Sequence, residues 1–230
     1  MSKKSKWSKD IIYRVNYKLD QEYKSPRLGN KKNPLNELLF IQLSLRTTGP
    51  SFERTYSYFK KRYPRWEQVF KASNKEVADA IFNAGLSKQK ASNLKKILNK
   101  LMKDFGRLSL SRLKHLDDYE IEAYLSSLPG IGKKTARCIM LYSFDRDVFP
   151  VDSHCFRIIK RLGWIGQDKK HTDKVADEIQ DLIPKSIRYS LHVNMVAHGR
   201  SMCHPVYPRC TICPILKLCP FGQEKIKNTD

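Results

Sequence analysis

Leu128-Pro-Gly-Ile-Gly-Lys-Lys-Thr-Ala136 sets two glycines two residues apart, directly before the start of a predicted helix. Gly130 and Gly132 permit positive φ and a close approach of the backbone to a ligand, and the first amide groups of a helix can bind an anion. Lys133 adds positive charge beside these amides. The stretch therefore fits a nucleic-acid phosphate, a contact that positions a protein without reading sequence. The alternative is a plain turn between helices that needs glycine only for its geometry.

Periodic apolar residues predict helices along most of the chain. An opening helix falls within residues 1–32, and the chain turns helical again at Asn36 until Gly49-Pro50 breaks the run. Ser73 and Glu76 form a capping box, which is typical of a helix N-terminus. Other helices are predicted at 51–62, 88–105, 117–128, 133–144, 152–162, 172–182 and 186–199. The sequence has no convincing alternating strand, internal repeat or low-complexity stretch, so the predicted fold class is all-α.

The predicted helix at 88–105 is amphipathic. Its apolar stripe consists of Leu94, Ile97, Leu98 and Leu101. Its lysines are expected mostly on the opposite face, and they are Lys88, Lys90, Lys95, Lys96, Lys100 and Lys103.

The chain is strongly basic. Its 230 residues include 44 Lys plus Arg against 23 Asp plus Glu, which gives a formal net charge of +21. A magnitude of about 2–8 is enough to keep a small domain soluble, so a surface that is merely rich in lysine is the weaker explanation. A field of this strength attracts polyanions, of which nucleic acid is the commonest in a cell. Charge alone does not separate DNA from RNA, or a binding protein from an enzyme.

Hydropathy argues against a membrane protein. The longest apolar run, 38–45, already contains Gln42 and Ser44 and is far shorter than the roughly 18 residues of a membrane span. The charged N-terminus has no apolar stretch behind it, which is unlike a secretory signal. A chain of this length suits one large domain or two small ones. We therefore expect a compact, basic protein of an intracellular, reducing compartment, without membrane association.

Four of the six cysteines cluster near the C-terminus, at Cys203, Cys210, Cys213 and Cys219. In a reducing compartment, four thiols within so short a segment favour a metal or cluster site over two disulfides. Structural zinc commonly uses paired Cys-x2-Cys knuckles, and only one such pair is present. Uneven gaps fit an iron–sulfur cluster better. Cys138 and Cys155 fall within predicted helices and are expected to pack as small hydrophobic residues.

Lys134 and Asp152 are the candidate catalytic pair. Lys134 lies in the first turn after the hairpin, and a helix and a loop separate it from Asp152. A partly desolvated amine beside a carboxylate can lose its proton and act as a nucleophile that forms a Schiff base. The alternatives are a solvated surface lysine and an aspartate that serves as a helix N-cap.

Three segments, in this order, resemble the endonuclease III branch of the helix-hairpin-helix DNA glycosylases. Residues 128–136 are similar to the family's hairpin, and its catalytic lysine falls on Lys134. Val151-Asp-Ser-His154, followed by Phe156-Arg157, is similar to the segment with the catalytic aspartate, which falls on Asp152. The cysteine spacing of six, two and five residues matches the family's [4Fe-4S] loop.

The resemblance covers roughly residues 30–220 and implies a two-lobed, all-α glycosylase fold with DNA in the cleft. A helical-barrel lobe is expected at 30–146, with the helix-hairpin-helix at 119–144. Residues 1–29 and 147–230 are expected to form the cluster lobe, with the iron–sulfur loop at 203–219. The implied partner is double-stranded DNA with a damaged or abasic nucleotide, bound by a monomer.

The resemblance also implies a reaction on a nucleotide that is flipped out of the duplex. Lys134 would attack the sugar C1′, Asp152 would assist its deprotonation and stabilise positive charge on the sugar, and β-elimination from the Schiff base would nick the strand. The [4Fe-4S] cluster would be structural, held by Cys203, Cys210, Cys213 and Cys219. Gly85-Leu86 is similar, more weakly, to the family's loop whose leucine wedges into the opened duplex. DNA contacts are implied for Arg46, Leu86, Gly130, Gly132, Lys133, His154 and Arg157.

The preferred base is the open question. Arg46 stands where endonuclease III has a glutamine, and such an arginine is similar to the thymine-mismatch branch, which tends not to keep a lysine at the position of Lys134. Ile41 occupies the place of the catalytic carboxylate of the adenine-removing branch, and residues 149–152 are similar to glycosylases of methylated cytosine. We expect a bifunctional glycosylase and lyase for a damaged, oxidised pyrimidine. The alternatives are a monofunctional glycosylase for mispaired thymine or another modified base, and a non-catalytic, cluster-bearing DNA-binding protein.

Overall fold

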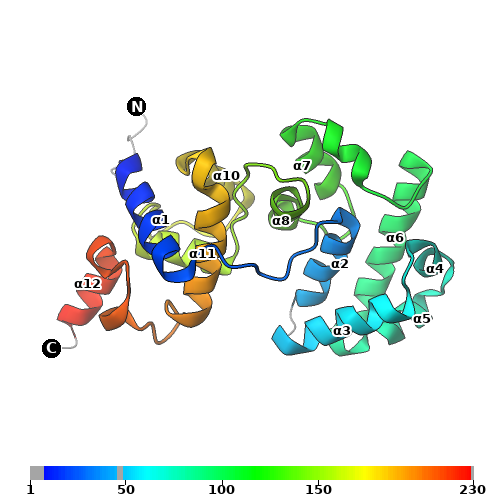
Figure 1. Ribbon diagram of the computed structural model, residues 1–230, viewed down its shortest axis with the longest axis horizontal. Coiled ribbons are helices and arrows are strands. Elements are labelled where there is room, and N and C mark those ends of the chain that lie inside the picture. The colour runs from blue at the N-terminus through cyan, green and yellow to red at the C-terminus, as the bar shows by residue number, and fades with distance from the viewer. Residues whose placement is uncertain (1–7, 46–48, 229–230) are drawn as a thin grey trace. The chain divides into compact units, whose positions relative to one another are not determined.

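The structure is a computed structural model that describes residues 8–45 and 49–228 (Figure 1). Within these ranges every regular element is an α-helix or a short 3-10 helix, so the predicted all-α class is confirmed. None of the described helices is long and apolar enough to cross a membrane. Two compact units make up the chain: residues 30–146, here called the inserted unit, and residues 1–29 with 147–230, called the terminal unit.

The inserted unit is built of short helices joined by tight turns. Its elements are α2 (Pro34–Ser44), α3 (Gly49–Arg62), α4 (Trp66–Lys71), α5 (Asn74–Ala80), η1 (Phe82–Ala84), α6 (Ser87–Phe105), η2 (Ser111–His115), α7 (Asp118–Ser126) and α8 (Lys133–Ser143). Neighbours along the chain pack in pairs, α5 on α6 and α7 on α8. The capping box of Ser73 and Glu76 is confirmed at the start of α5.

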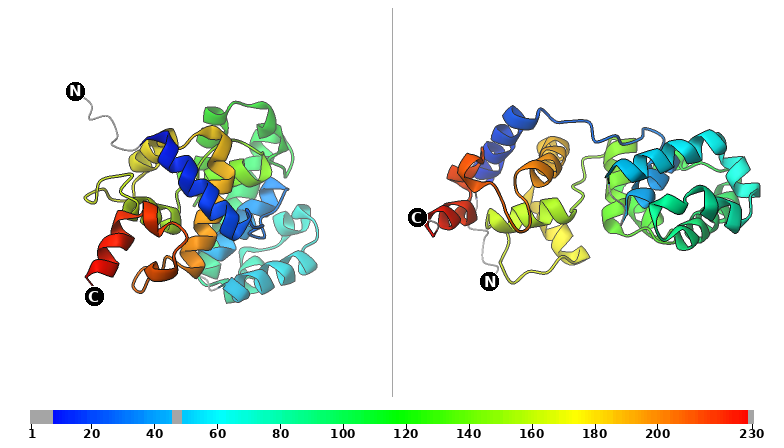
Figure 2. Two further views of the ribbon diagram at one scale, coloured as in Figure 1. Left: turned by 60° about the vertical axis from the view of Figure 1, so that its left-hand side comes forward. Right: turned by 90° about the horizontal axis from the view of Figure 1, so that it is seen from below.

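Helix α2 forms the centre of the inserted unit. It contacts α3, α6 and α8, and Figures 1 and 2 show it between these helices. It is apolar on nearly all sides, as expected of a helix that other helices surround. Asn33 starts it by accepting the backbone N–H groups of Leu35 and Asn36, and Pro34 follows at the first helical position, where a missing N–H costs nothing.

The terminal unit joins the two ends of the chain. It comprises α1 (Lys9–Tyr23), α9 (Ser153–Arg161), α10 (Asp173–Leu182), η3 (Lys185–Ile187), α11 (Arg188–Ser201), η4 (Cys210–Ile212), η5 (Leu216–Leu218) and α12 (Pro220–Lys227). Helix α11 packs against both α1 and α9 (Figures 1 and 2). One face of α1 buries Ile12, Val15 and Leu19 completely, and each such side chain contributes about 1.5–3 kcal/mol through its removal from water.

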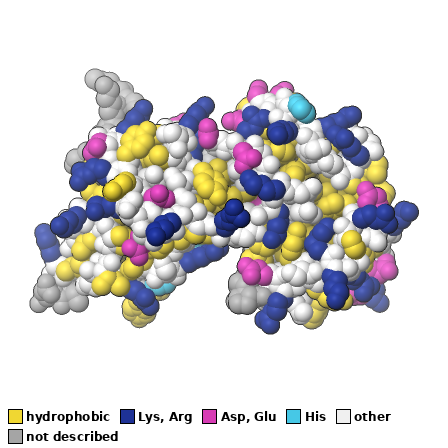
Figure 3. Space-filling model, in the orientation of Figure 1, with side chains coloured by type: hydrophobic (Ala, Val, Ile, Leu, Met, Phe, Trp, Pro, Cys, Tyr) yellow, Lys and Arg dark blue, Asp and Glu magenta, His cyan; other side chains and the backbone are white. Residues whose placement is uncertain are grey.

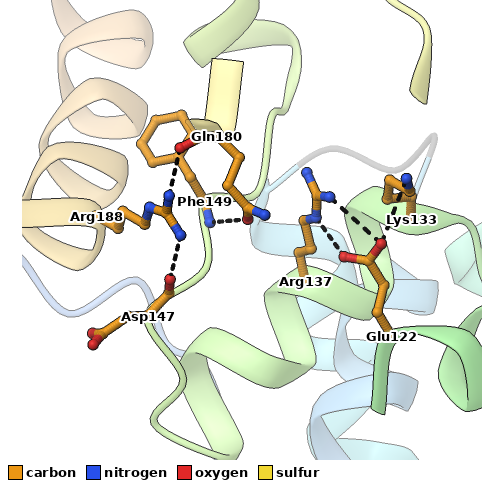
Figure 4. A network of polar contacts seen from close by, with 7 residues as sticks. All are labelled: Glu122, Lys133, Arg137, Asp147, Phe149, Gln180 and Arg188. Carbon is orange, nitrogen blue, oxygen red and sulfur yellow. Dashed lines mark hydrogen bonds and ion pairs between the residues drawn. The ribbon is translucent and has the colours of Figure 1, made fainter. Parts of the chain in front are cut away.

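An extended segment leads from the exposed Asp147 to the start of α9, and its residues 148–151 are buried. The backbone N–H of Phe149 donates to the side chain of Gln180 over 2.8 Å, and the Arg188 guanidinium donates to the carbonyls of Asp147 and Gln180 (Figure 4). Arg188 also donates to the carbonyl of Ile183 over 3.0 Å. Because α10 and α11 hold this segment by its backbone, they also fix where α9 begins.

Two helices were missed and one lysine was misplaced by the sequence prediction. The pattern did not predict α4 or α12, which have only 6 and 8 residues and therefore few apolar repeats. Helix α6 matches the predicted 88–105 range closely, but Lys90 departs from the expected solvent face, since only 8% of it is exposed. A long side chain with three donors can be buried where backbone carbonyls converge, and the periodicity of apolar residues does not reveal such a place.

Candidate functional site

The hairpin between α7 and α8 is a tight turn anchored by two buried side chains. Ile131 donates its N–H to the carbonyl of Leu128 over 3.1 Å, and both side chains are buried. Between them, Pro129 and Gly130 occupy the central positions, and Gly130 has a φ of +77°. Proline followed by a residue of positive φ is typical of a type II turn, which explains the glycine at 130.

The two hairpin glycines serve different purposes. A Cβ on Gly130 would lie 2.5 Å from the Asn93 side chain, in addition to the strain of its positive φ. Gly132 is the N-cap of α8 with an ordinary φ of −94°, and among the described residues no atom lies within 4 Å of a Cβ placed there. Neither packing nor backbone conformation therefore requires glycine at 132. What glycine does provide is an uncovered approach to the first amides of α8, where an anion is stabilised.

Glu122 ties the two hairpin helices together. Its carboxylate on α7 lies 2.6 Å from Nε of Arg137 and 3.5 Å from Nζ of Lys133, both on α8 (Figure 4). Arg137 is almost fully buried, and an unpaired charge there would cost several kcal/mol. The expectation that Lys133 adds charge at the N-terminus of α8 is thus qualified, since a carboxylate partly offsets that charge.

Lys134 lies in the first turn of α8 and is half-buried. Glu37 on α2 is completely buried and accepts the backbone N–H of Lys31 over 2.6 Å and the Asn30 side chain over 2.5 Å. Burial raises the pKa of Glu37. The two hydrogen bonds oppose this shift, and the positive charges of Lys31 and Lys134 oppose it to a smaller extent. This carboxylate near Lys134 was not predicted from the sequence. Its one signal is a glutamate at the head of an otherwise apolar run.

Of the predicted DNA contacts, Leu86 is exposed at the start of α6. Leu86, the N-cap of α6, is 49% exposed and has a φ of +51°, which is rare for a residue with a side chain of this size. Arg46 lies outside the described residues, so its expected role stays a prediction. Leu45, the residue before it, is 42% exposed.

Asp152 belongs to the terminal unit and begins α9. Its Oδ1 accepts the N–H of Cys155 over 2.8 Å, so it is the N-cap that was considered as an alternative to a catalytic role. The cap uses one carboxylate oxygen and orients the whole group at the helix start. A cap and a catalytic role are therefore compatible, and the catalytic role stays a prediction.

His154 and Arg157 are partly buried and contact α11 and the residues that follow it. Arg157 donates to the carbonyl of Cys203 over 3.0 Å and to that of Gly199 over 3.1 Å, and its Nη2 lies 3.2 Å from Nδ1 of His154. A Cβ on Gly199 would lie 2.5 Å from the same Nδ1, so this glycine lets α9 and α11 approach each other. Burial, more than any neighbouring charge, lowers the pKa of His154. Both side chains thus connect helices here, and the DNA contacts expected of them stay predictions.

The four clustered cysteines line one cavity in the terminal unit. Its walls include Arg161 of α9, His198 of α11 and Phe221 of α12, together with Cys203, Cys210, Cys213 and Cys219. None of the six cysteines, all of which the structure describes, forms a disulfide. Cys138 and Cys155 are buried within α8 and α9, as predicted.

Polar groups from α9 and α11 surround this cavity. Arg161 donates to Sγ of Cys203 over 3.1 Å and to the carbonyls of His204 and Pro205, each over 2.8 Å. The hydroxyl oxygen of Tyr23 lies 2.9 Å from Nδ1 of His198, and Nε2 of His198 lies 3.7 Å from Sγ of Cys213. Burial, with a smaller effect of Arg157, lowers the pKa of His198 to about 4, so the imidazole is neutral at pH 7.

The donor set of the cavity suits a thiolate-bound metal cofactor. Burial is the main cause that raises the pKa of Cys213 to about 11, and it also raises that of Cys210 and Cys219. Neutral thiols are therefore the stable form of the protein alone, and a metal would displace their protons on binding. Within residues 8–45 and 49–228, no three His, Cys, Asp or Glu side chains converge as ligands of a single ion.

The surface has the charge expected of a polyanion-binding protein. On the face drawn in Figure 3, Lys and Arg side chains are widely spread and outnumber Asp and Glu. The formal excess of +21 is therefore visible as an extended surface property and is not confined to one terminus.

Comparison with known proteins identifies similar chains. Residues 36–185 match the HhH-GPD superfamily base excision DNA repair protein family. A putative DNA glycosylase of Arabidopsis thaliana, At3g47830, is 33% identical over 170 residues, which are 74% of this chain and 58% of the relative. This chain therefore spans less than two thirds of that relative's length.

Two further comparisons cover nearly whole chains. Endonuclease III of Bacillus subtilis (strain 168) is 30% identical over 196 residues, which are 85% of each chain. A structure described as a non-covalent endonuclease III–DNA complex superposes with a TM-score of 0.81 at 26% identity, and the match covers 96% of this chain and 99% of that one.

The two hairpin glycines provide a matched pair of substitutions. Gly130→Ala is expected to lower the free energy of unfolding by more than about 1 kcal/mol, because alanine is strained at positive φ. Gly132→Ala is expected to change it by less than about 0.5 kcal/mol, because the added methyl meets no described atom. Urea unfolding followed by circular dichroism measures both. Equal destabilisation by the two substitutions would contradict the distinction.

Proposed function

Because this chain belongs to the HhH-GPD superfamily of base excision DNA repair proteins and is an endonuclease III-like DNA glycosylase, we propose that it is bifunctional, excising an oxidised pyrimidine and then nicking the strand. The observation that carries the proposal is the amine of Lys134 in the first turn of α8, two residues after Gly132. The uncovered N-terminus of α8 binds a phosphate of the backbone. The sugar of that strand then lies within reach of the side chain that follows.

The proposed reaction begins at the sugar of a nucleotide rotated out of the duplex. The neutral amine of Lys134 attacks C1′ as the bond from C1′ to the base breaks, and the base leaves with that electron pair. The nitrogen gives up one proton to Asp152, and its lone pair then forms the C1′=N bond as the C1′–O4′ bond breaks and O4′ takes up a proton, which yields a protonated Schiff base. Loss of a C2′ proton then expels the 3′ phosphate by β-elimination and nicks the strand.

Asp152 is proposed to assist the loss of the proton from Lys134 and to stabilise positive charge that develops on the sugar. Its position as N-cap supports this role, because the hydrogen bond to Cys155 holds the carboxylate in one orientation. Glu37 is proposed to affect Lys134 only through its negative charge. Its carboxylate is fully buried and already accepts the backbone N–H of Lys31, in the segment before α2.

The cavity of the terminal unit is proposed to hold a [4Fe-4S] cluster through Cys203, Cys210, Cys213 and Cys219. When bound, the cluster would cross-link residues 203–219 and so order this loop without taking part in the reaction. Arg161 supports the assignment, because its guanidinium already holds the loop at Cys203, His204 and Pro205.

Borohydride trapping tests the nucleophile and the base together. The wild-type protein is expected to give a covalent adduct with duplexes that contain thymine glycol or a bare abasic site, and Lys134→Gln is expected to give none. Lys133→Gln is the matched control and should retain the adduct. Asp152→Asn keeps the helix cap, since asparagine caps as well as aspartate, and should slow base release by about 10²–10⁴-fold.

The outcomes of this experiment separate the alternatives. An adduct that persists in Lys134→Gln would contradict the assignment of the nucleophile. An adduct on the abasic duplex alone would keep the lyase and reject the oxidised pyrimidine. Thymine released from a T:G duplex without any adduct would favour a monofunctional enzyme. Tight binding with neither adduct nor base release would favour a non-catalytic DNA-binding protein.

The phosphate contact has its own test. Gly132→Ala is expected to weaken binding to a duplex with a tetrahydrofuran abasic analogue by about 10-fold, because a methyl group would block contacts worth about 1.5 kcal/mol. Fluorescence anisotropy at two salt concentrations measures the affinity. An unchanged affinity in the folded variant would contradict a phosphate at this helix end.

The cluster is tested by metal analysis. Protein purified without oxygen is expected to contain iron and sulfide and to be yellow-brown, and Cys213→Ser is expected to lose most of both. Cys155→Ser, a buried cysteine of α9 that is not part of the cavity, should retain them. Zinc in place of iron would overturn the assignment.

A further inference from the structure

Lys90 is a buried cation that the proposed reaction does not use. It lies on α6, only 8% of it is exposed, and its ammonium donates to the carbonyls of Leu43, Leu45 and Ala84 at 3.3, 2.9 and 2.7 Å. An ammonium group has three N–H donors, so these carbonyls satisfy the group completely. A buried charge is tolerated only where its donors are satisfied in this way.

The three carbonyls belong to two different helix ends. Those of Leu43 and Leu45 lie at the C-terminus of α2, and that of Ala84 is the last of η1. Carbonyls at a helix C-terminus lack partners within the helix and carry its negative partial charge, which favours a cation. Lys90 therefore caps two helices at once and links the segments that leave them.

Each linked segment presents an exposed leucine. Leu45 follows α2 and is 42% exposed, and Leu86 follows η1 and is 49% exposed. Leu86 also has a φ of +51°, a conformation that persists only where the surroundings enforce it. Lys90 helps to enforce this conformation of Leu86 through two hydrogen bonds. Its backbone N–H donates to the carbonyl of Leu86 over 2.9 Å, and its ammonium donates to the carbonyl of Ala84, two residues before Leu86.

The resemblance implies that Leu86 wedges into the opened duplex. We propose that Lys90 is the positioning residue for this step: it fixes Leu86 relative to Leu45, so that both exposed leucines meet the bases as a nucleotide rotates out. This inference rests on the proposed function, because it concerns the same DNA. Apolar side chains that enter a base stack must be held rigidly, since unstacking costs a few kcal/mol per step. Lys90 would act on strand opening and not on bond cleavage.

Lys95 is a matched control on the same helix. Its ammonium donates to the carbonyls of Val69, Phe70 and Ala72, at the C-terminal end of α4. Burial lowers the pKa of both lysines, so the two groups also resemble each other electrostatically. Lys95 holds a single helix end, however, and none of its three carbonyl partners belongs to the segments that present Leu45 and Leu86.

The experiment uses the full chain and a duplex that cannot react. The duplex carries a tetrahydrofuran abasic analogue opposite 2-aminopurine, whose fluorescence rises when the base is unstacked. Wild-type protein and Lys95→Met are expected to raise the fluorescence equally at saturation. Lys90→Met is expected to bind within about 3-fold of wild type but to give at most one fifth of the rise. A full rise with folded Lys90→Met would overturn the proposal.

A second variant keeps the proposal testable if Lys90→Met does not fold. Leu86→Ala removes an exposed side chain and is expected to reduce the fluorescence rise while the melting temperature is retained. An unchanged rise with Leu86→Ala would overturn the proposal, because the held leucine would then not enter the duplex. A double variant with Lys90→Met and Leu86→Ala is expected to reduce the fluorescence rise no more than the more severe single substitution does. Additive losses of the rise would count against a shared role.

The readout also separates this inference from the proposed function. Unstacking of 2-aminopurine needs no base release and no Schiff base. Suppose that no Lys134-dependent adduct is trapped, but the fluorescence rise depends on Lys90. This result would reject the lyase and support Lys90 as a positioning residue. Normal trapping, together with a fluorescence rise that is independent of Lys90, would support the lyase and reject the positioning role of Lys90.

Discussion

The turn at Pro129 and Gly130 is the constraint on which the candidate site depends. The positive φ of Gly130 lets the chain reverse between two buried side chains, and the direction of α8 follows from that reversal. Glu122 then secures the geometry by pairing with Arg137 across the two helices. Because Lys134 lies in the first turn of α8, the backbone conformation of the turn and the ion pair of Glu122 with Arg137 set where its backbone lies.

A basic composition overstates the charge available to a ligand. Lys90, Arg157 and Arg188 donate to backbone carbonyls, largely where helices end, and Arg161 donates to those of the cysteine loop. Such groups replace side-chain caps and connect helices that short loops leave poorly joined. They are structural cations within a chain of net charge +21, so the field that attracts DNA comes from the remaining surface lysines and arginines.

Asp152, which is proposed to assist the reaction, also has a role in the fold. The extended segment from 147 to 151 is held by Gln180 and Arg188, and Asp152 ends that segment by capping α9. The proposed role beside a developing sugar cation would use the same geometry, because the cap holds the carboxylate in one orientation at the start of α9.

Local features could be predicted from the amino-acid sequence: the all-α class, most helix positions, the capping box at Ser73 and the buried packing of Cys138 and Cys155. Periodicity and capping depend on neighbours within a few residues, so one sequence reveals them. The burial of Lys90, the approach of Glu37 to Lys134 and the ion pair of Glu122 with Lys133 became known only from the folded chain. These depend on carbonyls and charges brought together from distant parts of the chain, and no local pattern encodes where such groups meet.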